Sequence, residues 1–153
     1  MTQTQGIMLV LPLAVGLAAI IGTILIQGMA LSALIDFVRK EKRLGHAGTN
    51  RWTDVWIVAL TMSLTLAAHL IEIGLWAVLF VSCGEFSEFA TAYYHSAVNF
   101  TTLGYGDLIL TPHWRLLGPL EAADGMLMFG VSTAMIFAVI QKLVRTRFVD
   151  LRD

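Results

Sequence analysis

The stretch Thr101-Thr102-Leu103-Gly104-Tyr105-Gly106-Asp107 lies between two long apolar segments and decides how the chain is organised. Its two glycines stand at alternate positions, and glycine adopts positive φ angles at little steric cost. Such a backbone can turn its peptide oxygens to one side, where they replace the hydration shell of a cation. Thr102 can add its hydroxyl oxygen below the row of carbonyls, and Tyr105 can support the loop from behind. The stretch therefore predicts a cation-coordinating loop.

The composition is that of an integral membrane protein. Of the 153 residues, 57% are hydrophobic and only 14% are charged, which is far from the composition of ordinary soluble domains. A hydrocarbon core about 30 Å thick is crossed by about 20 apolar residues in a helix. We expect spanning helices at residues 7–38, 53–83 and 116–143. The first apolar stretch is too long for a cleaved signal peptide and has no basic start.

The segment between the second and third predicted spans is too apolar for an exposed loop. Residues 86–100 can form about four helical turns, and residues 101–107 follow them directly. We expect a half-helix that enters the membrane and points its partly negative C-terminal end at the membrane centre, where it can stabilise a cation. The predicted fold class is therefore an all-α membrane protein, with one domain over residues 1–153.

The distribution of basic residues predicts the orientation. All but Arg115 of the ten Lys and Arg residues lie in two clusters: Arg39, Lys40, Lys42, Arg43 and Arg51, and Lys142, Arg145, Arg147 and Arg152. Three crossings put both clusters on one side, which the positive-inside rule assigns to the cytoplasm. We therefore expect a multi-pass protein of the cell membrane, plasma or inner, with its N-terminus outside and its C-terminus in the cytoplasm. Membrane lipid is an expected partner, and nucleic acid is not.

With these features together, the chain resembles the pore module of potassium channels over roughly residues 55–141. The parts that match are an outer helix, a pore helix, a signature selectivity filter and an inner helix. The resemblance implies a potassium-selective channel subunit that conducts K⁺ passively, with K⁺ as the permeant ion at the filter and no cofactor. Because each chain carries the motif once, it also implies a homotetramer with the filter on the symmetry axis.

The resemblance assigns roles to the residues of the filter and the pore helix. The ion sites would be formed by carbonyl oxygens of Thr102, Leu103, Gly104 and Tyr105. The expected filter-support residues are Thr101, Gly106, Asp107, Tyr94 and His95. Leu103 departs from the Val or Ile that is usual in the family, so the packing behind the filter is expected to differ.

Asp107 would stand at the outer mouth and hydrogen-bond back to the pore helix. In simple bacterial members of the family a Glu of that helix helps to hold this Asp, whereas Val98 occupies the position here. Tyr94 and His95 are the two candidates for the missing partner. For Tyr94, anchoring at the membrane interface is the alternative role. Because Leu103 and Val98 can both loosen the filter, a weakly selective monovalent cation channel remains the closest alternative function.

The third predicted span carries residues that the resemblance places at the cavity. They recur at helical spacing, and a stripe used for helix packing is the alternative interpretation. The expected cavity residues are Met126, Phe129, Thr133 and Phe137. Gly125 and Gly130 lie where inner helices of the family often bend, although glycine in an apolar helix also permits close packing.

Four ionisable residues fall inside the predicted spans, where they are costly unless partnered. They are His69, Glu72, Glu121 and Asp124. We expect a hydrogen-bonded cluster behind the pore, with at least one carboxyl group protonated and His69 a candidate cation. Two alternatives stay open: a pH-sensing role for His69, and a metal site in a membrane metal-binding or sensory protein.

Several features are absent from the sequence. No nucleophile motif or phosphate-binding loop occurs, so we expect no enzyme activity. Cys83 is the only cysteine and cannot form an intrachain disulfide. No span carries regularly spaced arginines, and we expect neither a voltage sensor nor a cytoplasmic ligand domain. Gating would then come from the filter, the inner helices, lipid, pH or a separate regulatory protein. The first span is expected to pack outside the outer helix.

Overall fold

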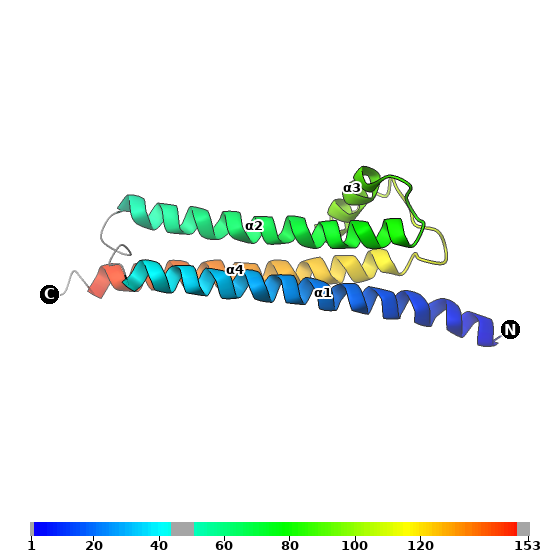
Figure 1. The fold of residues 1–153 in the computed structure, drawn as a ribbon, viewed down its shortest axis with the longest axis horizontal. Helices are drawn as coiled ribbons and strands as arrows, with labels where there is room; N and C mark the ends of the chain where they lie inside the picture. The colour runs from blue at the N-terminus through cyan, green and yellow to red at the C-terminus, as the bar shows by residue number, and fades with distance from the viewer. Residues whose placement is uncertain (1, 44–50, 150–153) are drawn as a thin grey trace.

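The computed structural model describes residues 2–43 and 51–149, and this part of the chain is helical apart from its connections. The elements are α1 (Thr2–Arg43), α2 (Arg51–Ser82), α3 (Phe89–Phe100) and α4 (Leu117–Val149). The long helices α1, α2 and α4 run along the long axis of the molecule, and the short α3 lies steeply across it beside one end of α2 (Figure 1). The predicted all-α membrane fold is confirmed.

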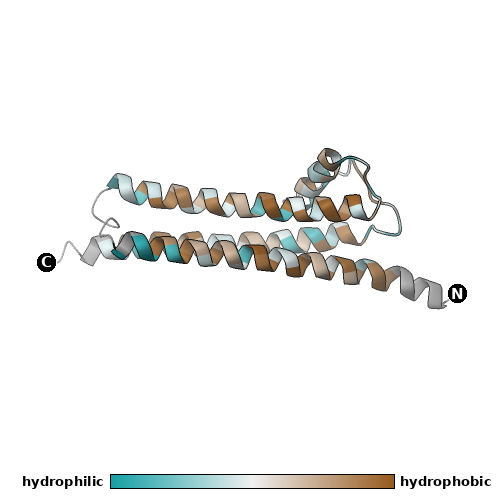
Figure 2. Cartoon of the chain, in the orientation of Figure 1, coloured by the Kyte–Doolittle hydropathy of each residue, from teal (hydrophilic) through white to brown (hydrophobic). Residues whose placement is uncertain are grey.

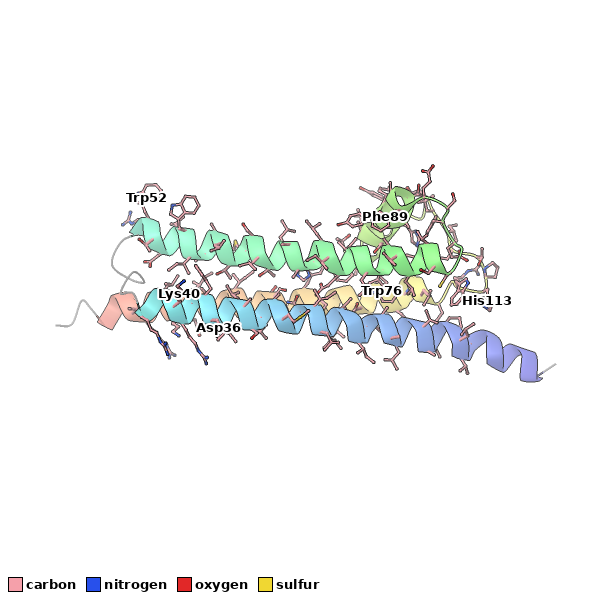
Figure 3. All side chains as sticks on the ribbon, in the orientation of Figure 1. Asp36, Lys40, Trp52, Trp76, Phe89 and His113 are labelled. Carbon is pink, nitrogen blue, oxygen red and sulfur yellow. The ribbon has the colours of Figure 1, made fainter. Side chains whose placement is uncertain are left out.

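Three helices are long and apolar enough to cross a membrane. The candidate spans are Leu9–Lys40, Arg51–Ser82 and Leu117–Thr146. At about 1.5 Å per residue, helices of this length exceed a hydrocarbon core of about 30 Å and reach the headgroup layers. Figure 2 shows long hydrophobic stretches along these helices, interrupted by polar positions within the bundle. Lys40 and Trp52 lie at one end of the bundle and His113 at the other (Figure 3).

The half-helix α3 begins at Phe89, three residues later than the predicted start at residue 86. The reason is the way in which α2 ends. The Gly84 amide donates to the Val81 carbonyl, and the Glu85 amide donates to the Phe80 carbonyl, while Gly84 has φ +75°. This is a Schellman motif, in which a left-handed residue stops the helix. The chain needs the following residues to reverse direction before α3 can start.

The core lies where α2, α3 and α4 meet. Its fully buried side chains include Trp76 and Phe80 of α2, Phe100 of α3 and Leu117 of α4. Large rings at this junction fill the space that the inclined α3 leaves between two nearly parallel helices. The packing therefore fixes α3 at the end of the bundle where the loop 101–107 emerges.

Helix α1 packs against both α2 and α4 instead of lying only outside α2, which corrects the expectation from the sequence. A Cβ atom built on Gly16 would lie 2.7 Å from Leu120 of α4, and one on Gly22 would lie 2.9 Å from Leu75 of α2. Small residues that let backbones approach closely are the usual device for helix association in lipid. The first helix is therefore an integral part of the bundle.

Candidate ion-conducting filter

The loop 101–107 is attached to the last turn of α3 by its own amide groups. The Thr102 amide donates to the Asn99 carbonyl at 2.8 Å, and the amides of Leu103 and Gly104 donate to the Val98 carbonyl at 2.9 and 3.2 Å. All peptide bonds in the described residues are trans, so the carbonyl in each peptide plane points away from its amide. The carbonyls of Thr101, Thr102 and Leu103 consequently point away from α3.

Positive φ angles recur at every second residue of the loop. Thr102 has φ +60°, Gly104 has φ +59° and Gly106 has φ +71°. In a regular strand, successive carbonyls alternate between the two sides. A backbone that alternates between left-handed and right-handed residues instead gathers its amides on one side and its carbonyls on the other. The φ angles of Gly104 and Gly106 are those that glycine adopts at little cost, and with Thr102 they recur at every second position of the loop.

Thr102 is an unusual residue for its backbone position. It stands just past the end of α3, where the amides of Thr102 and Leu103 donate to carbonyls three and five residues back. The end of α2 has the same pattern with Gly84 in the left-handed position. A β-branched residue pays a conformational cost there that glycine avoids. The same motif thus carries glycine at one helix end and threonine at the loop.

The seven residues of the loop are all exposed in the single chain. Leu103 is 55% exposed and Tyr105 is 67% exposed, and no element of the described chain closes the carbonyl side. Three or four carbonyls on one strand cannot surround a cation, because a dehydrated ion needs oxygen ligands on all sides. The loop of one chain therefore has the geometry to line only one side of such a site.

Asp107 is held by the pore helix through Tyr94. The Tyr94 hydroxyl donates to the Asp107 carboxylate at 2.8 Å, and this bond raises the pKa of the Tyr94 phenol above its usual range. His95 contacts other partners: its ring packs against Phe80 and Phe86, and its Nε2 lies 2.9 Å from the Asn99 amide nitrogen. Of the two candidates named from the sequence, the structure brings only Tyr94 to Asp107.

A second contact, made of two hydrogen bonds, fixes the segment that follows the loop. The Glu85 carboxylate accepts hydrogen bonds from the Thr111 amide at 2.7 Å and from the Thr111 hydroxyl at 2.6 Å. This pair ties the turn before α3 to the segment that follows the loop. Sequence reasoning missed it, because Glu85 and Thr111 carry no motif and are separated by 26 residues.

The ionisable residues within the spans form separate hydrogen-bonded groups rather than one cluster. Asp124 accepts from the Trp76 indole at 2.9 Å and lies 2.9 Å from the Thr23 hydroxyl, whose oxygen is also 2.7 Å from the Ile20 carbonyl oxygen. Glu121 is bonded to Ser96 of α3 at 2.5 Å. Each group crosses between helices, so the residues fix α4 against α1, α2 and α3. Thr23 and Ser96 were missed, since a hydroxyl in an apolar helix gives a weak signal.

His69 and Glu72 belong to a chain of contacts that reaches all three long helices. The Gln27 amide donates to the Ser132 hydroxyl at 2.8 Å, and that hydroxyl lies 3.0 Å from His69 Nε2. His69 Nδ1 lies 2.8 Å from the Glu72 carboxylate. Every donor finds an acceptor if the Ser132 hydroxyl donates to a neutral His69, whose Nδ1–H donates to Glu72. These contacts link α1, α2 and α4 through polar side chains within the bundle.

The four residues considered as a metal site do not come together as the ligands of one ion. Among the residues that the structure describes, no three His, Cys, Asp or Glu side chains gather as ligands of one ion. His69 and Glu72 are a pair at one depth, whereas Glu121 and Asp124 bind hydroxyl and indole donors. These four residues therefore do not form the metal site that this alternative requires.

The inner helix presents the expected cavity residues on one exposed face. Met126 is 60% and Phe137 is 59% exposed, and Thr133 is also exposed. Phe129 is partly covered by other rings. The centroid of its ring lies 4.5 Å from that of His69 and 5.7 Å from that of Phe100. Their role at a cavity stays a prediction, since a single chain leaves this face open.

The two glycines of α4 have different surroundings. A Cβ atom on Gly125 would lie 1.9 Å from the Phe100 carbonyl oxygen, whereas nothing lies within 4 Å of one on Gly130. Helix α4 continues through both positions. The backbones of α4 and α3 therefore approach closely at Gly125, and a hinge at either glycine stays a prediction.

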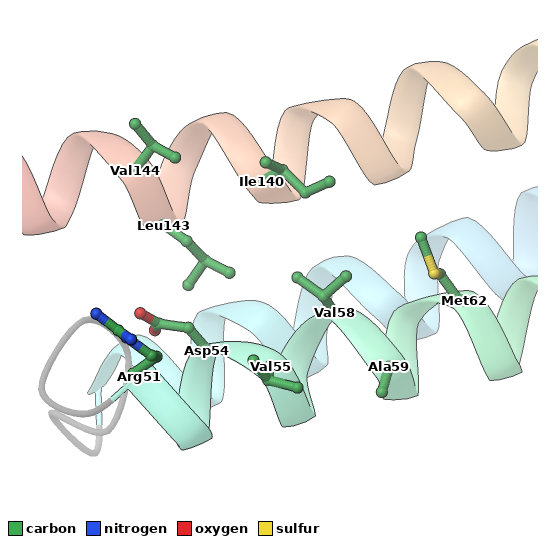
Figure 4. Close-up of a pocket in the computed structure, with 9 residues that line it drawn as sticks. All are labelled: Arg51, Asp54, Val55, Val58, Ala59, Met62, Ile140, Leu143 and Val144. Carbon is green, nitrogen blue, oxygen red and sulfur yellow. The ribbon is translucent and has the colours of Figure 1, made fainter.

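A groove of about 490 Å³ runs between α2 and α4 toward the end remote from the loop (Figure 4). Its lining is apolar, with Val58, Met62 and Ile140 among its residues and Arg51 and Asp54 at one end. A surface of this kind offers no row of oxygen ligands.

Comparison with known proteins gives a family match. Residues 68–142 match a family model described as "Ion channel", and the match covers the second half of α2, all of α3, the loop and α4 as far as Lys142. The match supports an ion-channel pore in a multi-pass membrane protein, and it points to a channel rather than an enzyme. No curated protein and no solved structure matches the chain.

Proposed function

We propose that the chain is the subunit of a potassium-selective channel that conducts K⁺ passively. The observation that carries this proposal is the direction of the loop carbonyls. The amides of Thr102, Leu103 and Gly104 are held by α3, so the carbonyl oxygens of Thr101, Thr102 and Leu103, on the opposite side of the same peptide planes, are free for a cation. Potassium is the ion that such rows of backbone carbonyls bind in place of its hydration shell.

The pore is assembled from four copies of the chain. A single loop supplies oxygen ligands from one side only, and all seven of its residues are exposed. Fourfold repetition about one axis turns each carbonyl into a ring, which is how closed homo-oligomers build a site that one subunit lacks. Thr102, Leu103, Gly104 and Tyr105 supply the rings, and the face with Met126 and Phe137 lines the cavity below them.

The channel lies in the cell membrane with its loop toward the outside. Lys40 lies at the end of the bundle remote from α3 (Figure 3), and the basic residues Arg39 and Arg145 belong to the same side. The positive-inside rule places this end in the cytoplasm. The filter then opens outward, with Asp107 at its outer mouth.

Replacing Gly104 by Ala tests the proposal, because alanine disfavours the φ of +59° that the filter needs. The matched control is Gly84→Ala, which introduces the same residue at φ +75° in a turn where nothing lies within 4 Å of the new Cβ. Both changes cost about 1–2 kcal/mol of backbone strain. In liposomes loaded with K⁺, Gly104→Ala should abolish potassium efflux, while Gly84→Ala should retain most of it. Equal efflux from both variants would contradict the assignment of the filter.

A further inference from the structure

Glu121 lies at the contact between the inner helix and the pore helix. Its side chain is fully buried, as is that of Ser96, and the two are 2.5 Å apart. One turn further along α4, Gly125 meets the carbonyl of Phe100. The two contacts together hold the last two turns of α3, from which the filter emerges.

The two short contacts of Ser96 favour a protonated Glu121. The Ser96 hydroxyl oxygen lies 2.8 Å from the Ile73 carbonyl oxygen of α2 and 2.5 Å from Glu121 Oε1. A hydroxyl carries one hydrogen, and a carbonyl and a carboxylate are both acceptors only. With an ionised Glu121, one of these short contacts would join two oxygens with no hydrogen between them. Both contacts contain a hydrogen if the Glu121 carboxyl group donates to Ser96 and Ser96 donates to Ile73.

The surroundings of Glu121 offer no charge that would stabilise an anion. Its Oε2 atom is buried with no hydrogen-bond donor within bonding geometry, and the described residues form no ion pair with it. The polar groups that face it are Ser96 and Asn99 of α3, both of which can donate a hydrogen bond to a carboxylate, and the like-signed Asp124 of α4. From α2 only the Ile73 carbonyl approaches, through Ser96, and Thr23 of α1 bonds to Asp124 instead. An anion without a charged partner is far more costly in such a place than a neutral acid.

We propose that Glu121 is a permanently protonated positioning residue whose carboxyl group donates to Ser96 and so fixes the pore helix between the inner and outer helices. The purpose of this contact rests on the proposed channel function, whereas its geometry does not. Ser96 lies two residues before Val98, whose carbonyl holds the amides of Leu103 and Gly104. A shift of α3 would therefore move the filter carbonyls directly.

Infrared spectroscopy of the purified full chain in lipid tests the protonation without any ion current. A protonated carboxyl group has a C=O stretch separate from that of a carboxylate, so the difference spectrum between the native protein and Glu121→Gln should show the loss of one protonated-carboxyl band at neutral pH. The control is Glu88→Gln, which removes an exposed carboxyl group at the start of α3 and should remove only carboxylate bands. Loss of a carboxylate band in Glu121→Gln would overturn the proposal.

Potassium efflux from liposomes then tests the positioning role. Gln keeps the shape of Glu and a donor for Ser96, so Glu121→Gln should retain at least half of the native flux, whereas Glu121→Leu should lose it at least tenfold. Glu121→Gln behaving like Glu121→Leu would contradict the neutral donor. If Glu121→Leu fails to fold, the spectrum and flux of Glu121→Gln still decide the question. A protonated band without native K⁺ flux would refute the proposed function alone, and flux without the band would refute this inference alone.

Discussion

Thr102 occupies a backbone position that the same chain fills with glycine at the end of α2. Its hydroxyl group has no hydrogen-bond partner within the described residues, and its φ of +60° disfavours a β-branched side chain. Strained residues of this kind persist where the surrounding structure and the function require them. We interpret the exposed hydroxyl as the lowest oxygen ligand of the filter.

Replacing Thr102 by Gly should therefore lower potassium conduction without lowering the stability of the fold. Relief of the left-handed strain favours the variant by about 1–2 kcal/mol, and the greater freedom of glycine in the unfolded chain offsets about 0.5–1 kcal/mol of this. Thermal unfolding should show a stability that is unchanged or slightly higher, while potassium flux falls. A variant that is both less stable and fully conducting would contradict this account of Thr102.

His95 predicts a dependence of stability on pH. Burial between aromatic rings lowers the pKa of His95, and the carboxylates of Asp107 and Glu85 offset part of this effect. The folded protein then binds fewer protons at His95 than the unfolded chain does. The contribution of His95 to the free energy of unfolding is therefore fully present above about pH 6.5, the ordinary pKa of histidine. It falls as the pH drops from there toward the lowered pKa of His95.

Thermal unfolding at about pH 7 and about pH 5 measures this contribution. His95→Gln keeps an acceptor for Asn99 but cannot be protonated, so the drop in melting temperature on acidification should be smaller than in the native protein. His113→Gln is the control, because His113 lies outside the buried aromatic cluster and contacts Trp114. An equal acid-induced drop in the native protein and His95→Gln would show that His95 is not the source.

Some of these residue roles could be predicted from the sequence, and others could not. The positive φ of Gly104 and Gly106 follows from glycine at alternate positions in the loop. The partner of Asp107 could be narrowed to Tyr94 or His95, but choosing between them needs the rotation of α3 about its own axis. That rotation is set by the aromatic packing around His95, which joins residues distant in sequence.

At the scale of elements, the approach of α4 to α3 depends on Gly125. Gly125→Ala would place a Cβ atom 1.9 Å from a backbone oxygen of Phe100, and neither helix can shift without moving the filter. Overpacking of this kind costs about 1–3 kcal/mol, occasionally more. The variant should unfold at lower temperature than the native protein and lose potassium flux.

Gly130 supplies the matched control for this prediction. Gly130→Ala adds the same methyl group to the same helix at a position with nothing within 4 Å. Alanine is favoured over glycine inside a helix by about 0.5–1 kcal/mol, so this variant should be at least as stable as the native protein. A similar loss of stability in both variants would point to bending of α4 at its glycines rather than to close packing at Gly125.

The helices themselves were largely predictable, because apolar length alone identifies a spanning segment. The contacts between the helices could not be predicted in this way. The position of α1 depends on Gly16 and Gly22 and on the bonds of Thr23 and Gln27 to α4. An apolar helix with a few small or hydroxyl-bearing residues carries no signal that says which neighbour these residues face. The late start of α3 likewise depended on the turn at Gly84.

At the scale of the whole molecule, one chain is incomplete as a channel. The loop is exposed on its carbonyl side, and the face of α4 with Met126 and Phe137 is also uncovered. Both surfaces are expected to turn toward a common axis in a tetramer. The fold, the spans and the family match describe one chain, and under the proposed function selectivity belongs to four loops together.

The reversal potential of the purified native protein in a planar bilayer, with K⁺ on one side and Na⁺ on the other, tests potassium selectivity itself. Rings of carbonyls that replace the hydration shell of potassium predict a current that reverses far from zero, close to the equilibrium potential of K⁺. Gly104→Ala, inserted in the same way, should give no such current. A reversal potential near zero for the native protein would contradict potassium selectivity and identify a weakly selective cation channel.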